Sequence, residues 1–226
     1  MKASAIITAA GSGQRLGRGE PKAFVMLKGR TMLSYSLATV ESVAGVEEII
    51  ITVPAGMETT ARSEASSVRL PVKIVVGGAE RQDSVRIALS LTSAESEMVV
   101  IHDAARPFAD AHLFERCLEA ARRSGSAIAA IPVSDTLKRG ANGLVTATVP
   151  RAGLWQAQTP QAFQRSLLIA AHERAVRESI VATDDADLLE QNGTRVEIVE
   201  GSTRNIKITT PSDLEIAEAI LTTLRS

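Results

Sequence analysis

The chain has 226 residues, of which 45% are hydrophobic and 23% charged, a balance typical of a folded protein with a large apolar core. Its 25 basic and 26 acidic side chains leave a formal net charge of −1 at pH 7, which argues against a nucleic-acid-binding protein or one that binds anionic membranes through a broad basic surface. The single cysteine, Cys117, excludes a disulfide framework and a cysteine metal cluster, so we interpret it as an inert core thiol of a protein from a reducing compartment.

The N-terminal run from Ala3 to Ala10 resembles the apolar part of a signal peptide, but it is short and is interrupted by Ser4 and Thr8. It also leads directly into a glycine-rich loop that cleavage would destroy. No apolar stretch approaches the roughly 20 residues that a membrane span needs. We therefore expect a cytoplasmic protein with a single domain over residues 1–226.

Short apolar runs of strand length alternate along the chain with segments of helical period. The expected strands are Ala5–Ala9, Ile49–Val53, Val72–Val76, Met98–Ile101, Ala127–Ile131 and Val196–Val199. The expected helices are Thr31–Val43, Met57–Ser67, Gln82–Leu91, Ala111–Arg123 and one around Leu167–Arg177, with two more that begin at Thr183-Asp184 and at Pro211. This alternation predicts an α/β fold with a mainly parallel twisted sheet and helices on both faces. Because ligands of such sheets bind at the carboxyl ends of the strands, the loops that leave the strands are the candidate sites.

The loop after the first expected strand combines glycines, Gly11, Gly13 and Gly17, with the cations Arg15, Arg18 and Lys22. Backbone N–H groups of a glycine turn and fixed positive charge favour an anion such as a phosphate chain. The loop lacks the Gly-Lys-Ser/Thr ending of a Walker A motif, and its third glycine comes one residue too late for a dinucleotide fingerprint. A glycine-rich surface turn with incidental charge remains the alternative at this stage.

Two later loops carry further polar groups. Gly77-Gly78, followed by Ser84, could hold a planar base against bare backbone, although a plain turn with a helix cap explains the same residues. Asp103 leaves the end of a central strand, where a carboxylate could bind Mg²⁺ or a ribose hydroxyl. We interpret the neighbouring His102 as a hydrogen-bonded packing residue, and Arg106 as a partner for a phosphate or an acid.

The second half of the chain departs from the alternation. Asp135 to Arg151 reads as a β-hairpin, with turn signals from Gly140 to Gly143, and such an excursion often reaches a neighbouring subunit. The chain then returns through Trp155–Phe163. Lys207 lies in a β-like run, Asn205–Thr209. It can bind a ligand only if its side chain points toward the loops at the carboxyl ends of the strands, and otherwise it points to solvent.

Taken together, these motifs resemble those of the 2-C-methyl-D-erythritol 4-phosphate cytidylyltransferases of the non-mevalonate isoprenoid pathway. In chain order they are Ala9-Ala10-Gly11-x-Gly13-x-Arg15-Leu16-Gly17 with Pro21-Lys22, Gly77-Gly78-x-x-Arg81-x-x-Ser84, His102-Asp103-Ala104-Ala105-Arg106-Pro107, Asp135-Thr136-x-Lys138, Gln158-Thr159-Pro160-Gln161-x-Phe163, Thr183-Asp184 and Asn205–Thr209. Each motif alone is weakly specific, but seven in the family's order from residue 9 to residue 213 are specific. One departure is Ala79, where some relatives carry an acid, although contacts at that position are thought to use the backbone.

The resemblance implies a Rossmann-like nucleotidyltransferase fold with a protruding, dimerising β-arm at about 133–154. It implies CTP and methylerythritol phosphate as substrates, Mg²⁺ or another divalent cation as cofactor, and a homodimer. The residues that it implies for catalysis are Arg15, Lys22, Arg151 and Lys207; for the nucleotide Ala9, Ala10, Gly11, Gly13, Gly78, Ala79, Ser84, Asp103 and Ala104; and for the acceptor Asp103, Arg106, Thr136, Arg151, Thr159, Thr183 and Lys207. Asp103 would meet the metal indirectly or through the nucleotide phosphates, and Thr136 and Arg151 would come from the other subunit's arm.

Three other functions stay open from the sequence. The same chemistry on another polyol phosphate, such as ribitol 5-phosphate, is the nearest, since related cytidylyltransferases share the first loop and the Thr-Pro-Gln segment. A nucleotide-sensing module would bind CTP without turnover. An NAD-dependent oxidoreductase is disfavoured by the late glycine and by the absence of an acid after Val53.

Overall fold

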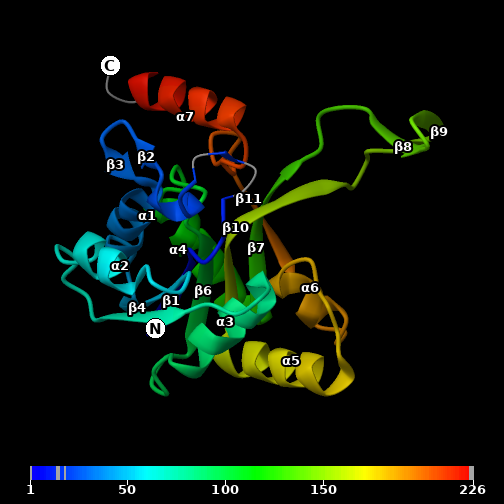
Figure 1. The fold of residues 1–226 in the computed structure, drawn as a ribbon. Helices are drawn as coiled ribbons and strands as arrows, with labels where there is room; N and C mark the ends of the chain where they lie inside the picture. Colours follow the sequence, from blue (N-terminus) through cyan, green and yellow to red (C-terminus); the bar gives the residue numbers. More distant parts are fainter. Residues whose placement is uncertain (1, 14–15, 18, 224–226) are drawn as a thin grey trace.

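The computed structural model describes residues 2–13, 16–17 and 19–223. In these ranges, seven strands form one mixed sheet in the order β11-β7-β10-β6-β1-β4-β5 (Figure 1). Their bounds are β1 Ala3–Thr8, β4 Val46–Val53, β5 Val72–Val76, β6 Met98–Asp103, β7 Ser126–Pro132, β10 Trp155–Gln164 and β11 Glu197–Glu200. Neighbouring strands are parallel except at β10, which runs antiparallel to both β6 and β7. The predicted α/β class with a mainly parallel sheet is confirmed.

Helices cover both faces of this sheet because successive side chains of its strands point to opposite sides. Ile7 of β1 packs in a cluster with α1 (Met32–Glu41), α2 (Glu58–Glu64) and α4 (Ala111–Ser124). Ile6, one residue earlier, packs with the helices of the other face, which are α3 (Arg81–Ser90), α5 (Arg165–Glu178) and α6 (Asp185–Glu190). Strands buried on both sides explain why the sequence shows continuous apolar runs rather than alternation.

A third, smaller apolar cluster lies beside the main sheet. It joins α7 (Pro211–Thr223) to the short hairpin of β2 (Met26–Leu27) and β3 (Arg30–Thr31), through side chains that include Leu27 and Leu214. The 3-10 helix η2 (Lys22–Phe24) enters this region directly after the first glycine loop. The C-terminal helix thus packs on the segment that follows that loop.

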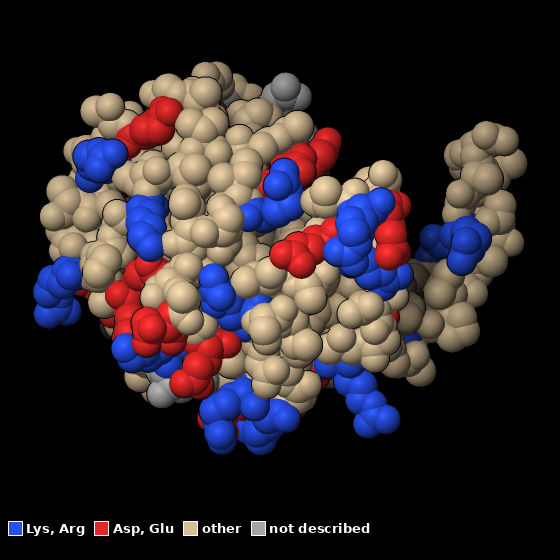
Figure 2. Space-filling view, turned by 90° about the horizontal axis from the view of Figure 1, so that it is seen from below, with Lys and Arg blue, Asp and Glu red and all other residues tan. Residues whose placement is uncertain are grey.

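The predicted hairpin is present and projects from the body as an arm (Figures 1 and 2). Its strands are β8 (Leu137–Ala141) and β9 (Leu144–Val149), and its turn places Asn142 and Gly143 at φ 52° and 77°. Two consecutive positive φ angles fit a two-residue hairpin turn, which asparagine and glycine adopt at low cost. Leu144 and Val145 are 73% and 68% exposed, so the arm offers apolar side chains to whatever it contacts.

Two segments in the second half of the chain take a structure that the sequence did not indicate. Trp155–Phe163, to which the sequence assigned no element, is most of the central strand β10, and its register with β7 shifts between Ala157 and Gln161. The β-like run Asn205–Thr209 joins no sheet. Its backbone is held instead by individual hydrogen bonds, such as the one from the Ile208 N–H to the Ala105 carbonyl at 2.9 Å.

Charged side chains of both signs are interspersed over the face that Figure 2 shows, in keeping with the net charge of −1. None of the helices in the described part of the chain combines the length and apolar character that a membrane crossing requires.

Candidate functional site

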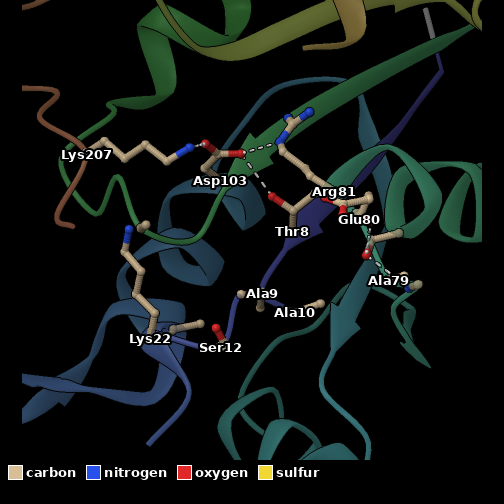
Figure 3. A pocket seen from close by; sticks show the side chains of 15 residues that line it. Thr8, Ala9, Ala10, Ser12, Lys22, Ala79, Glu80, Arg81, Asp103 and Lys207 are labelled. Atoms are coloured by element: carbon tan, nitrogen blue, oxygen red, sulfur yellow. Dashed lines mark hydrogen bonds and ion pairs between the residues drawn. The ribbon is translucent and has the colours of Figure 1, made fainter. Parts of the chain in front are cut away.

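A cavity of about 360 Å³ opens where β1, β5 and β6 end, the edge at which a parallel sheet binds its ligands (Figure 3). The loops after these three strands and the segment around residue 207 form its walls. Its lining residues are Thr8, Ala9, Ala10, Gly11, Ser12, Lys22, Ala23, Gly78, Ala79, Glu80, Arg81, Ser84, Asp103, Ala105 and Lys207.

One side of the cavity consists mostly of glycine and alanine, because the loop after β5 packs closely against the loop after β1 and against α3. A Cβ on Gly77 would stand 2.5 Å from the Ala10 Cβ, and one on Gly78 would stand 2.3 Å from the Asp83 Cβ. The Gly78 N–H donates to the Ser84 hydroxyl at 3.1 Å. Ser84 is therefore not the helix cap: α3 begins at Arg81 behind Glu80, whose capping box with Asp83 closes the helix end.

The first glycine loop folds back on itself and carries Lys22 to the cavity. Gly13 has φ 70°, and a Cβ there would lie 2.9 Å from both the Glu20 carbonyl oxygen and the Lys22 nitrogen. The Lys22 N–H donates to the Gly11 carbonyl at 3.3 Å, which closes the turn. Arg15 and Arg18, the two other cations of this loop, lie outside the described residues.

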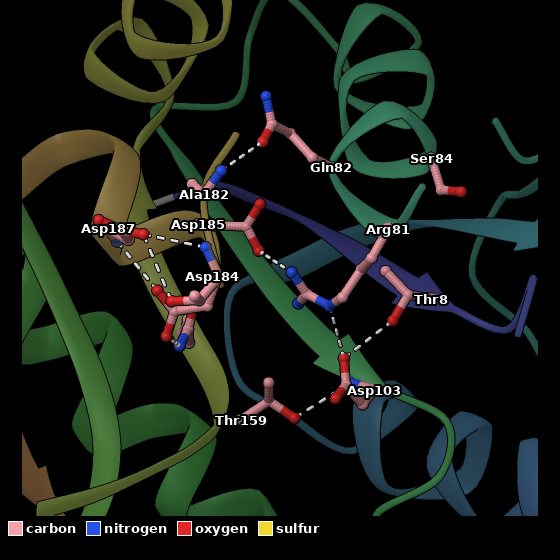
Figure 4. A network of polar contacts seen from close by, with 12 residues as sticks. Thr8, Arg81, Gln82, Ser84, Asp103, Thr159, Ala182, Asp184, Asp185 and Asp187 are labelled. Atoms are coloured by element: carbon pink, nitrogen blue, oxygen red, sulfur yellow. Dashed lines mark hydrogen bonds and ion pairs between the residues drawn. The ribbon is translucent and has the colours of Figure 1, made fainter. Parts of the chain in front are cut away.

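Asp103 is the electrostatic centre of the site. Its Oδ2 pairs with Lys207 Nζ at 2.6 Å, and its Oδ1 accepts from Arg81 Nε and from the Thr8 hydroxyl, both at 3.0 Å (Figures 3 and 4). Burial opposes ionisation of this carboxyl, but Arg81 and Lys207 outweigh it and hold the pKa of Asp103 well below its usual range. A permanent carboxylate thus orders two cations at the rim of the cavity.

Lys22 and Lys207 line the same cavity although 185 positions separate them in the sequence. In Figure 3 the Lys207 side chain extends to the Asp103 carboxylate, and the Lys22 side chain lies below them. The Lys207 side chain is 41% exposed, so its ammonium keeps donors for a ligand while it contacts Asp103. Two cations beside a glycine-lined wall are suited to polyphosphate and phosphate groups.

His102 is a packing residue, as the sequence suggested, and not a base. It is 1% exposed, and burial lowers its pKa to about 4. Its Nε2 contacts the Arg106 carbonyl at 3.1 Å; since a carbonyl only accepts, Nε2 carries the proton and Nδ1 accepts from the Thr159 hydroxyl at 3.0 Å. The Thr159 oxygen in turn accepts from the Asp103 N–H at 3.0 Å, so this chain fixes the backbone that carries Asp103.

Most of the predicted nucleotide residues meet at the cavity. Those that line it are Ala9, Ala10, Gly11, Gly78, Ala79, Ser84 and Asp103, and the predicted catalytic residues Lys22 and Lys207 line it as well. Gly13 lies behind Lys22, and Ala104 is fully buried, with its N–H bonded to the Thr8 carbonyl at 3.1 Å.

The other predicted acceptor residues lie away from the lining of the cavity. Arg106 donates to the Asn205 and Ala157 carbonyls at 2.8 and 3.3 Å. Thr159 is buried, and the exposed Thr183 bonds Asp187 through its N–H at 2.9 Å and through its hydroxyl at 3.3 Å. Thr136 and Arg151 are exposed at the base of the arm, where Arg151 contacts the Ser134 carbonyl. Their roles stay predictions.

Arg81 was not among the site residues predicted from the sequence. Its guanidinium lies between Asp103 and Asp185, 2.7 Å from the Oδ2 of the latter, and it lines the cavity. The only sequence signal was its fixed place between Gly78 and Ser84 in the second motif. Thr8, Ser12, Ala23, Glu80 and Ala105 were also not assigned to the site.

The described residues contain no group of three His, Cys, Asp or Glu side chains that could hold a metal ion by themselves. Within the lining of the cavity, Asp103 offers a carboxylate beside space for phosphate oxygens. One carboxylate combined with substrate phosphates is the usual donor set of Mg²⁺.

Comparison with known proteins identifies the family. The model of the family 2-C-methyl-D-erythritol 4-phosphate cytidylyltransferase matches residues 3–223. The enzyme of that name from Deinococcus radiodurans is 46% identical over 219 residues, which cover 97% of this chain and 89% of that protein. The one from Syntrophus aciditrophicus is 42% identical over 97% of this chain and 96% of its own length. The crystal structure of the Thermus thermophilus enzyme superimposes with a TM-score of 0.84 at 38% identity, over 98% of this chain and 100% of that one. The chain therefore belongs to the 2-C-methyl-D-erythritol 4-phosphate cytidylyltransferases, a family of nucleotidyltransferase enzymes.

Proposed function

We propose that this protein transfers the cytidylyl group of CTP to 2-C-methyl-D-erythritol 4-phosphate. A phosphate oxygen of the acceptor attacks the α-phosphorus of CTP, the bond between that phosphorus and the bridging oxygen to the β-phosphate breaks, and pyrophosphate leaves. The products are 4-CDP-2-C-methyl-D-erythritol and pyrophosphate. The observation that carries this proposal is the meeting of Lys22 and Lys207 in one cavity with a wall of glycine backbone.

The chemistry needs no general base. The second pKa of a phosphate monoester is about 6, so the acceptor is already largely a dianion at neutral pH. The buried, neutral His102 is therefore no obstacle to this mechanism. The difficulty is the approach of two anions and the growth of negative charge on the α-phosphoryl oxygens and on pyrophosphate, which positioned cations offset.

The residues of this chain divide between the two substrates. Backbone of Ala9, Ala10 and Gly11 and the Gly78-Ala79 loop with Ser84 would hold the cytidine, while Gly13 shapes the loop that brings Lys22 to the triphosphate. Arg15 would join Lys22 there, and Asp103 and Ala104 would lie at the ribose. Lys207 with Arg151 would hold the attacking phosphate in line, and the acceptor residues proposed around it are Asp103, Arg106, Thr136, Thr159 and Thr183.

We propose a divalent cation, Mg²⁺ or another ion of that charge, as the cofactor. Asp103 is the residue of this chain that would face it, with the nucleotide phosphates as the main ligands. When bound, the ion would neutralise charge on the triphosphate. A cytoplasmic location suits a reaction between two phosphorylated metabolites and a chain whose cysteine is a buried free thiol.

We further propose a homodimer in which the arm of one subunit completes the site of the other. The arm bears exposed Leu144 and Val145 and carries Thr136 and Arg151 at its base, away from the lining of its own cavity. Complementation tests this arrangement. Mixed subunits of inactive Lys22→Ala and inactive Arg151→Ala proteins should regain activity, because one site of each heterodimer then has both side chains. No recovery after proven subunit exchange would refute it.

Release of pyrophosphate from CTP, measured in parallel with methylerythritol phosphate and with ribitol 5-phosphate, tests the proposed reaction. We expect turnover with the former and little with the latter. Faster turnover with ribitol 5-phosphate would reassign the acceptor, and CTP binding without any turnover would favour a nucleotide sensor.

A further inference from the structure

A second buried carboxylate lies behind the cavity and has no part in the chemistry described above. Asp185, the first residue of α6, is 1% exposed and does not line the cavity. We propose that Asp185 is a positioning residue, which acts through Arg81 on Asp103 and keeps Lys207 in place for the acceptor phosphate. This inference rests on the proposed function for the role of Lys207.

The four side chains form one line of alternating charge. Asp185 Oδ2 accepts from Arg81 Nη1 at 2.7 Å, Arg81 Nε donates to Asp103 Oδ1 at 3.0 Å, and Asp103 Oδ2 meets Lys207 Nζ at 2.6 Å (Figures 3 and 4). Arg81 therefore uses different nitrogens for different carboxylates. The second oxygen of Asp103 is left to Lys207.

The segment that carries Asp185 is held in place by contacts that do not involve the site. The preceding residue, Asp184, accepts from the side-chain amide of Gln161 in β10 at 2.8 Å and caps α6 through the Asp187 N–H at 2.9 Å. Gln82, next to Arg81, bonds the Ile180 carbonyl and the Ala182 N–H of the loop before α6, each at 3.0 Å. The first turn of α6 is thus tied both to the sheet and to α3, so Asp185 is a fixed anchor.

If Asp185 loses its charge, Arg81 gains more from binding both oxygens of Asp103 than from bridging residues 103 and 185. A guanidinium forms its most favourable carboxylate contact with two parallel N–H···O bonds to both oxygens of one carboxylate. Arg81 would then take both oxygens of Asp103, including the one that Lys207 now uses. Lys207 is 41% exposed on its side chain and would move away into water.

Asp185→Asn, which keeps the shape and removes the charge, tests this inference. We expect kcat/KM for the acceptor to fall about 10–100-fold, the range found when an outer partner of an active-site ligand is removed in metal centres. In a Lys207→Ala background no Lys207 side chain is left to be released, so the same substitution should cost no more than about 2-fold, which is the usual error of additivity. Asp185→Glu, which restores the charge, should recover part of the loss, and Glu190→Gln, at the exposed end of the same helix, should change nothing.

Equal losses in the wild-type and Lys207→Ala backgrounds would overturn the inference, since they indicate a merely structural role. If Asp185→Asn does not fold, Arg81→Lys replaces it, because one ammonium cannot bridge the two carboxylates; the same dependence on Lys207 is expected. A crystal structure of the variant provides a readout that is independent of turnover. It should show Arg81 across both oxygens of Asp103 and Lys207 released, whereas an unchanged Lys207–Asp103 contact would refute the inference even if the wild-type protein used another acceptor.

Discussion

Replacement of Asp103 by asparagine tests the electrostatic centre of the site through protein stability. The amide oxygen can still accept from Thr8 and Arg81, and Arg81 keeps its bond to Asp185. The amide nitrogen, however, would face the Lys207 ammonium, so the 2.6 Å contact with Lys207 is lost. One hydrogen bond to a charged group contributes about 1.5–3 kcal/mol. We expect Asp103→Asn to lower the free energy of unfolding by about this much. The value should lie toward the lower end of the range, because the partly exposed Lys207 is rehydrated.

The loss of unfolding free energy in Asp103→Asn should become smaller as the pH falls. The folded-state pKa of Asp103 lies well below the unfolded value of about 3.9, so its stabilising contribution is complete above that pH and is lost as the pH falls toward the folded value. The difference in unfolding free energy between wild type and Asp103→Asn should be constant from pH 6 to 8 and should narrow at pH 3.

Chemical denaturation at pH 7 and at pH 3 measures this difference, and a thermal scan at pH 7 should show a Tm lower by about 3–12 °C for a chain of this size. Glu190→Gln is the matched control, since it removes an exposed carboxylate from α6, and it should change the free energy of unfolding by less than about 0.5 kcal/mol. Equal stability of wild type and Asp103→Asn at pH 7, or a difference that widens at pH 3, would show that the Asp103 carboxylate does not stabilise the fold through Lys207.

Three further predictions concern the cavity and the core. Lys22→Ala should lower kcat on the order of 10²–10³-fold, as loss of one charge-stabilising donor does, and near-normal turnover of the folded variant would remove Lys22 from the mechanism. Gly78→Ala places a Cβ 2.3 Å from the Asp83 Cβ, so the loop must shift; kcat/KM for CTP should fall by up to about 10²-fold, and an unchanged value would contradict backbone contact there. Cys117 is fully buried, and burial raises its pKa to about 12, so a thiol reagent at pH 8 should modify it only after the protein is denatured.

The sequence was sufficient for the elements that follow a local rule. The strands buried on both faces appear as apolar runs, and the hairpin turn at Asn142-Gly143 uses residues that favour positive φ. Strand β10 follows no such rule, because it contains Pro160 and several glutamines and has no continuous apolar run. Gln158 and Gln161 are buried there because each finds a distant partner, Gln158 at the Ser202 carbonyl and Gln161 at Asp184. Such partners are set by the tertiary fold and leave no local pattern.

The site likewise contains residues that a local pattern predicts and residues whose role depends on distant partners. Glycines and cations in one loop predicted an anion site, and the family motifs drew attention to Asp103 and Lys207. The central place of Arg81 was not foreseeable, because its role depends on carboxylates 22 and 104 positions away. Alternation alone likewise did not show which way the Lys207 side chain points. Its run joins no sheet, and individual contacts with the loop after β6 set its orientation.

A crystal structure of this protein with CTP and Mg²⁺ would show directly whether this cavity binds the nucleotide for transfer. We predict the cytosine ring against the backbone of Ala9-Ala10 and Gly78-Ala79, the triphosphate beside Lys22, and the α-phosphate open toward Lys207. A nucleotide bound outside this cavity, or one whose triphosphate points away from both lysines, would contradict it.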